Sequence, residues 1–124
     1  MIQILYGDDL NLDQPISSCA EKIVAETLNF KNILNYEISL VFVSDDYLSD
    51  LKKKYFKENQ YTDVIAFRLN EYGEPFIEGE VYISLPRAKE NAQKFDEPYS
   101  REVSRLIIHG CLHLIGLKDK TDIE

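Results

Sequence analysis

The order of strand-like and helix-like runs is the feature that most constrains the fold of this chain. Residues 37–44 form an apolar run typical of a buried strand, and residues 2–6 and 62–67 also show strand patterning. Apolar residues recur at helical spacing through residues 15–30, with Pro15 near the start. The complete order predicts βαβαββαα, which indicates an α+β fold with a mixed four-stranded sheet.

A β-hairpin is expected in the middle of the chain. Strand-like residues 62–67 and 80–84 are separated by a polar segment that contains Gly73 and Gly79. This spacing makes an antiparallel pair plausible.

Helix-capping residues mark the remaining elements. Ser44 or Asp45 is expected to cap a second helix, and Pro86 to open a third. The last helix is predicted to be capped near Ser100 and to end at Gly116. No repeat or linker divides the chain, so residues 1–124 are expected to form a single domain.

Composition limits the class of protein. The chain has 124 residues, no apolar run of membrane-spanning length and no pattern of a signal peptide, so we expect a cytoplasmic protein without a membrane partner. The formal net charge of −8 argues against general coating of nucleic acid but leaves room for a local basic groove. Cys19 and Cys111 lack metal-binding or disulfide spacing, and Cys111 is expected to be a small core residue.

Two histidines, His109 and His113, lie four residues apart in the predicted last helix. Residues at i and i+4 share one helix face, so both imidazoles can point at one metal ion. Zinc peptidases with the HExxH motif use this spacing together with a Glu that acts as general base. Here that position is Gly110, so the peptidase base is absent.

A catalytic zinc usually takes three protein ligands and keeps one position open. Asp119 is the first candidate for the third ligand and Asp122 the second, because Gly116 lets the backbone turn back toward the histidines. The alternative is an ordinary amphipathic helix with polar or buried histidines and solvated aspartates.

Basic residues are dense at one place only, in Lys52, Lys53, Lys54 and Lys57. A solvated helix face explains this run better than a phosphate-binding patch on charge pattern alone.

Three segments carry a family resemblance: HGCLHLIG followed by Asp119, the TDVIAF run at 62–67, and GEVYIS at 79–84. Together they resemble the YbeY family of bacterial rRNA-maturation endoribonucleases, in the family's order over about residues 36–121. It implies an α+β metal-dependent hydrolase that acts in processing and quality control of ribosomal RNA, 16S above all. The implied partner is the rRNA of the small ribosomal subunit.

The family motif HxxxHxxxxxH places its first two histidines on His109 and His113, and its third on Asp119. Two histidines and one carboxylate form a known zinc set. The extra negative charge would lower Lewis acidity and shift preference toward manganese or another divalent ion, although zinc remains the first choice.

Other positions depart from the family pattern. An Arg that often follows the Tyr at Tyr55, and that is implicated in RNA handling, is replaced here by Phe56. Lys57 or the Lys52–Lys54 run would then take over phosphate binding. Relatives usually continue beyond the position of Glu124 into a further helix, so we expect either a short member or a truncated chain.

The resemblance and the ligand set predict that His109, His113 and Asp119 hold a metal that activates water for attack on phosphorus or activates a 2′-OH. Lys118 and Lys120 could stabilise charge on the phosphate, or be ordinary exposed lysines. Asp63 has two interpretations: it orients a ligand histidine or, as we prefer, it has a structural role at the end of the strand.

The leading hypothesis is therefore a zinc-dependent endoribonuclease specific for single-stranded regions of rRNA precursors. The alternatives are a non-catalytic ribosome-assembly factor with a structural metal and a metal hydrolase of another substrate, such as a peptide.

Overall fold

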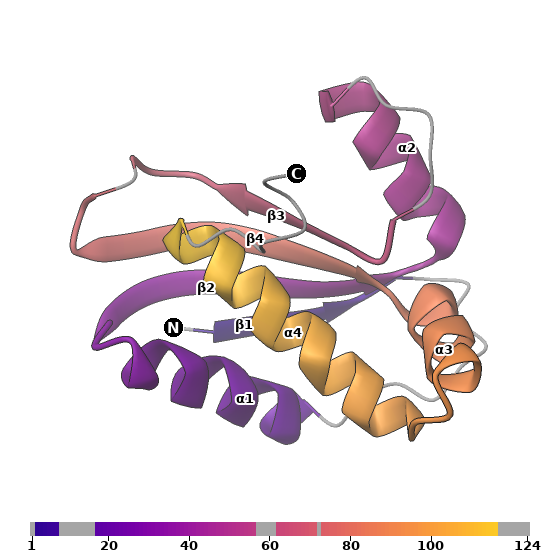
Figure 1. The fold of residues 1–124 in the computed structure, drawn as a ribbon. Coiled ribbons are helices and arrows are strands. Elements are labelled where there is room, and N and C mark those ends of the chain that lie inside the picture. Colours follow the sequence, from indigo (N-terminus) through magenta and orange to yellow (C-terminus); the bar gives the residue numbers. More distant parts are fainter. Residues whose placement is uncertain (1, 8–16, 57–61, 72, 117–124) are drawn as a thin grey trace.

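The computed structural model describes residues 2–7, 17–56, 62–71 and 73–116. Within these segments the elements follow the predicted βαβαββαα order (Figure 1). The strands are β1 (Ile2–Tyr6), β2 (Asn35–Val43), β3 (Val64–Arg68) and β4 (Phe76–Ser84). The helices are α1 (Ser17–Phe30), α2 (Asp45–Phe56), α3 (Leu85–Lys94) and α4 (Tyr99–Ile115). The α+β class with a four-stranded mixed sheet is confirmed.

The sheet has the strand order β1-β2-β4-β3. β1 and β2 are parallel, as are β2 and β4, while β3 runs antiparallel to β4. In register, Leu40 of β2 lies opposite Val81 of β4, which in turn lies opposite Ala66 of β3. The predicted antiparallel hairpin is therefore confirmed, and β3 is one edge of the sheet.

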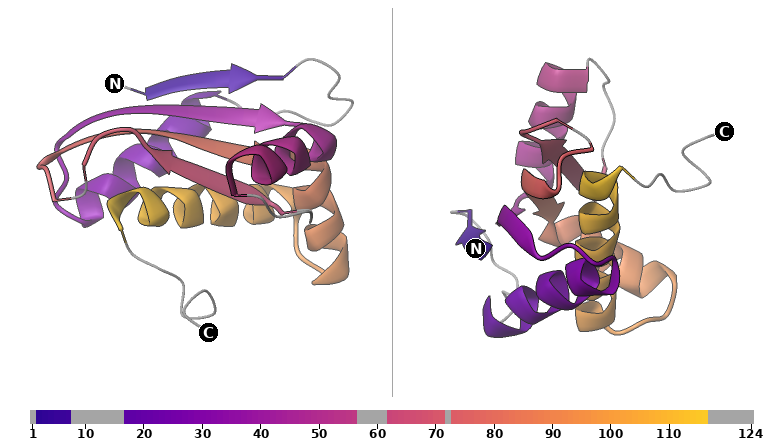
Figure 2. Two further views of the ribbon diagram at one scale, coloured as in Figure 1. Left: turned by 90° about the horizontal axis from the view of Figure 1, so that it is seen from above. Right: turned by 90° about the vertical axis from the view of Figure 1, so that its left-hand side faces the viewer.

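Helices α1 and α4 cover one face of the sheet, as the views of Figure 2 show. Alternate residues of the central strands point into this layer, where Leu40, Phe42 and Val81 are fully buried against α4 residues such as Leu106. The intervening residues point to the other face, where α2 packs Leu48 against Val43 and Ile65. The main core thus lies directly beneath α4.

The position of Gly79 differs from the one expected in the hairpin. It was placed in the connection, but it lies inside β4, which begins at Phe76. A Cβ atom at this position would stand 2.6 Å from Leu114 Cδ2 and 2.9 Å from the Phe67 carbonyl oxygen. The glycine therefore lets α4 approach the sheet closely, rather than making a turn.

The helix caps agree with the sequence prediction in part. The Tyr47 backbone N–H donates to Ser44 Oγ at 3.1 Å, as expected for the start of α2. The cap predicted near Ser100 is wrong, because α4 begins at Tyr99 after Pro98, which makes no side-chain cap bond. Gly116 ends α4 with the left-handed φ of 100°, as expected.

No helix in the described segments is long and apolar enough to cross a membrane.

Candidate metal centre

The two histidines lie side by side on α4. The ring centroids of His109 and His113 are 4.4 Å apart, with an angle of 39° between the ring planes. Both side chains are partly buried, and the Nε2 atom of His113 is buried. The predicted shared face of the helix is confirmed.

Close packing of α4 against the sheet fixes the position of this pair. Gly110 lies between the histidines in the sequence and faces β4, where a Cβ atom would stand 2.4 Å from Val81 Cγ1 and 3.2 Å from Val64 Cγ2. Because glycine has no side chain, the helix backbone can lie close to the strands at this point. The residue that replaces the peptidase glutamate therefore has a packing role.

Cys111 does not contribute to the histidine face. Its side chain is fully buried in the core, and burial raises the pKa of its thiol to about 12. Two residues from each histidine, it points away from their shared face and into the core, so it is not placed as a ligand beside them. The prediction that Cys111 is a small core residue is confirmed.

The histidine pair fits two of the three protein ligands of a catalytic zinc, because neutral imidazoles are ordinary donors for this ion. Among the residues that the structure describes, no group of three His, Cys, Asp or Glu side chains is placed to hold a metal. Asp119 and Asp122 lie outside the described residues, so the third ligand stays a prediction.

Arg68 of β3 holds the last turn of α4. Its Nη1 donates to the Leu114 carbonyl oxygen at 2.8 Å, while Nε donates to Asn70 Oδ1 at 2.6 Å. Nη2 donates to the Glu71 carbonyl oxygen at 3.0 Å. One side chain therefore ties the β3–β4 hairpin to the helix turn that follows His113.

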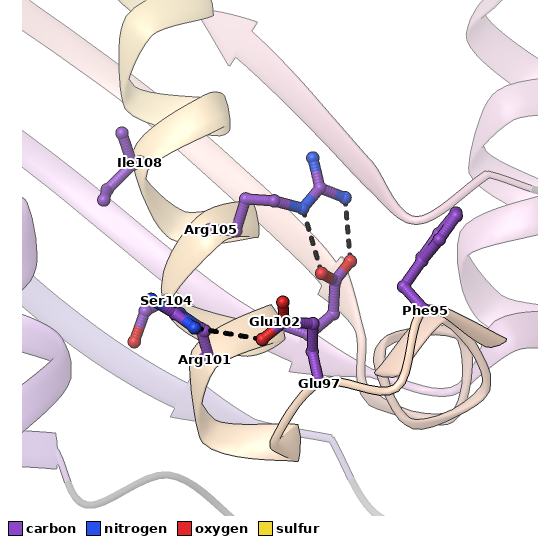
Figure 3. A pocket seen from close by; sticks show the side chains of 7 residues that line it. All are labelled: Phe95, Glu97, Arg101, Glu102, Ser104, Arg105 and Ile108. Carbon is purple, nitrogen blue, oxygen red and sulfur yellow. Dashed lines mark hydrogen bonds and ion pairs between the residues drawn. The ribbon is translucent and has the colours of Figure 1, made fainter. Parts of the chain in front are cut away.

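A second polar network lies one helical turn before His109. Arg105 Nε and Nη2 donate to the two carboxylate oxygens of Glu102 at 2.9 and 2.7 Å (Figure 3). Asn91 of α3 donates to Glu102 and to Asp63, each at 3.2 Å. The hydrogen bond from Arg105 holds the pKa of Glu102 below its usual range, against the opposing effect of burial.

Asp63 joins this network at the start of β3. Its Oδ2 lies 3.7 Å from Arg105 Nη2, and its backbone oxygen accepts from Ser84 N–H at 3.0 Å. These contacts connect β3, α3 and α4, which agrees with the structural role that we preferred. The sequence spacing of Glu102 and Arg105 could have indicated their pair, but not the partners from other elements.

Comparisons with known proteins agree with these features. A family model described as "Endoribonuclease YbeY" matches residues 5–124. The chain belongs to the YbeY family.

This chain matches different shares of the length of its curated YbeY relatives. The Endoribonuclease YbeY of Flavobacterium psychrophilum is 38% identical over 124 residues, which is 100% of this chain and 86% of that protein. That of Phocaeicola vulgatus is 43% identical over 84 residues, which is 68% of this chain and only 59% of that protein. A Thermotoga maritima protein solved in solution has a TM-score of 0.61 at 28% identity, covering 95% of this chain and 74% of that one.

The structure does not test several of the predicted site residues. Lys57, Lys118 and Lys120 lie outside the described residues, and Phe56 is the last residue of α2. Within α2, Lys53 and Lys54 are exposed, and the Lys54 ammonium lies 5.4 Å from the centroid of the Tyr55 ring. Their role in phosphate binding stays a prediction.

Proposed function

We propose that this chain is a metal-dependent endoribonuclease that cuts single-stranded regions of ribosomal RNA precursors, 16S above all, during ribosome maturation and quality control. The observation that carries the proposal is the side-by-side pair His109 and His113 on α4 of a YbeY-family chain. The curated relatives are named endoribonucleases, and the ribosomal RNA of the small subunit is the proposed cytoplasmic partner.

The proposed ligands are His109, His113 and Asp119, holding one zinc ion or, less favoured, manganese. When bound, the ion supplies Lewis acidity and activates water for attack on a phosphodiester. The two histidines supply neutral imidazole nitrogens from one rigid helix face. Gly110 packs against β4, and Arg68 bonds to the turn after them, so the helix backbone that carries both rings is held in place before RNA binds.

Positive side chains would complete the site. Lys118 and Lys120 flank Asp119 in the sequence and are proposed to stabilise negative charge that develops on the phosphate. Lys57 is proposed to bind a phosphate further along the strand.

The deciding experiment measures cleavage of a labelled rRNA-precursor fragment together with the metal content of the same protein sample. We expect His113→Ala to lose both metal and cleavage while keeping the circular dichroism of the parent. Full cleavage by the folded variant would contradict the proposal.

The two aspartates provide a matched pair for the third ligand. Asp119→Ala is expected to lose metal, Asp119→His to retain it, and Asp122→Ala to behave as the parent chain. The opposite behaviour of the two alanine variants would assign the ligand to Asp122.

The net charge of −8 favours a second candidate, a non-catalytic ribosome-assembly factor with a structural metal, because an acidic chain binds RNA less readily. Bound metal without cleavage of any precursor fragment would support this candidate. A peptide hydrolase is disfavoured by Gly110, which leaves no general base beside His109.

A further inference from the structure

A hollow of about 510 Å³ opens between the end of α3 and the exposed side of α4 (Figure 3). It lies at the first turns of α4, and its lining combines apolar side chains with two arginines and their acidic partners. The lining residues are Phe95, Glu97, Arg101, Glu102, Ser104, Arg105 and Ile108.

The apolar part of the hollow is open to solvent. Phe95, which follows the last residue of α3, is 61% exposed, and Ile108 of α4 is 40% exposed. Exposed aromatic rings on RNA-binding proteins are surfaces on which nucleobases stack, and every base has a face that can use them.

The charged part of the hollow is ordered and balanced. Arg105 is fixed by both oxygens of Glu102, yet its side chain is 54% exposed. Arg101 Nη1 lies 3.1 Å from Glu97 Oε2, so each glutamate of the lining has an arginine partner. A planar guanidinium held in this way can donate to a phosphate without a large ordering cost.

Position connects the hollow to the histidines. Arg105 precedes His109 by four residues and therefore lies one turn away on the same helix face. We propose that the hollow is a nucleotide-binding subsite for the RNA strand, in which a base stacks on Phe95 and the guanidinium of Arg105 contacts a phosphate. The identity of this ligand rests on the proposed function.

The test is binding of a labelled single-stranded RNA to chelator-treated protein, measured by fluorescence anisotropy over a range of salt concentrations. A strand of the same length without bases is measured in parallel. Phe95→Ala is expected to weaken binding of the RNA roughly fivefold or more, and to leave the abasic strand unaffected. Arg105→Ala is expected to weaken both strands and to reduce the salt slope by about 0.7.

Matched controls are present in α1. Phe30 is 81% exposed, and the Lys31 ammonium lies 5.5 Å from its ring centroid, much as Lys94 lies 5.7 Å from that of Phe95. Phe30→Ala is therefore the control for the aromatic ring. Lys22→Ala, which removes one exposed cation paired with Glu26 at 3.9 Å, is the control for charge.

A further variant guards against misfolding. Arg105→Ala leaves the Glu102 carboxylate buried without this partner, so the double variant Arg105→Ala, Glu102→Gln is compared with Glu102→Gln alone. The loss of affinity on removing Arg105 should persist in that comparison.

The subsite is overturned if Phe95→Ala and Arg105→Ala bind both strands like their α1 controls, or if the parent chain binds neither strand. Because the assay needs no metal, it separates this proposal from the previous one. If the parent cleaves RNA while both variants bind normally, the subsite proposal is wrong and the proposed enzyme function is unaffected. If the parent binds RNA through Phe95 and Arg105 but never cleaves it, the proposed enzyme function is wrong and the subsite proposal is unaffected.

Discussion

The two faces of the sheet are packed in different ways. Beneath α1 and α4, fully buried aliphatic side chains and two close glycine contacts form one continuous core. On the opposite face, α2 buries a small cluster around Leu48, and beyond it aromatic rings contact one another while Tyr47 and Tyr55 remain 50% and 57% exposed. The comparison teaches that the face that carries the histidines is also the face with least freedom to rearrange.

Equivalent truncations on the two faces should show the largest difference. Leu106 in α4 and Leu48 in α2 are both almost fully buried, and each Leu→Ala change is expected to cost about 2–5 kcal/mol of unfolding free energy. We expect Leu106→Ala near the upper end, because the large core cannot collapse around the cavity, and Leu48→Ala near the lower end. Urea unfolding measures both, and a larger loss from Leu48→Ala would reverse the comparison.

Gly110→Ala tests the close contact of α4 with β4. The added methyl group would meet the stiff Val81 side chain at 2.4 Å, so we expect a loss of about 1–3 kcal/mol and reduced metal affinity as the histidines move. Thermal unfolding and metal titration measure the two effects. Arg101→Ala, at an exposed α4 position, serves as control and should stay within about 0.5 kcal/mol of the parent.

The two faces should also differ in the pH range in which they lose stability: the α4 face at acid pH and the α2 face at alkaline pH. Glu102 has a pKa below the usual 4.5, so the unfolded chain binds more protons there and stability falls as the pH drops below 4.5. Tyr82, on the α2 face, has a pKa raised to about 12, chiefly by burial and then by Glu80. The unfolded chain therefore loses its proton first, and stability falls as the pH rises from 10 toward 12.

Two variants separate the acid and alkaline parts of the plot of unfolding free energy against pH. Glu102→Gln should flatten the acid limb of unfolding free energy against pH and leave the alkaline limb, whereas Tyr82→Phe should do the reverse. Equal effects of both variants on one limb would contradict the assignment.

The smallest effect is expected for the exposed aromatic contact of α2. Tyr47 stacks on Tyr82 with centroids 6.3 Å apart, so Tyr47→Ala should cost about 0.5–1.5 kcal/mol. Chemical denaturation measures this loss, and a cost that matches Leu106→Ala would show that the α2 face is as tightly coupled as the α4 face.

Local patterns account for what could be predicted from the sequence. The spacing of His109 and His113 determines their shared face once the segment is helical, and alternation in β3 and β4 indicates the hairpin. Gly79 was misplaced because a glycine in a polar run has the same local signature in a turn and in a strand, and only the approach of Leu114 distinguishes them.

The supporting contacts of the site could not be predicted, because they join distant parts of the chain. Arg68 reaches the Leu114 carbonyl across 46 residues, and Asp63 meets Asn91 and Arg105 from other elements. No periodicity in one segment encodes such a contact, since it depends on how β3, α3 and α4 pack together.

The bond from Arg68 to Leu114 makes the hairpin and the last turn of α4 one cooperative unit. Opening either part breaks the bond that joins them, so stabilising one part should also slow amide exchange in the other. A cation that binds the histidines would then slow exchange in β3 and at Leu69, whose N–H donates to the Glu78 carbonyl at 2.7 Å. Amide exchange in the hairpin would thus show whether the histidines of α4 hold a cation, although the hairpin does not contact it.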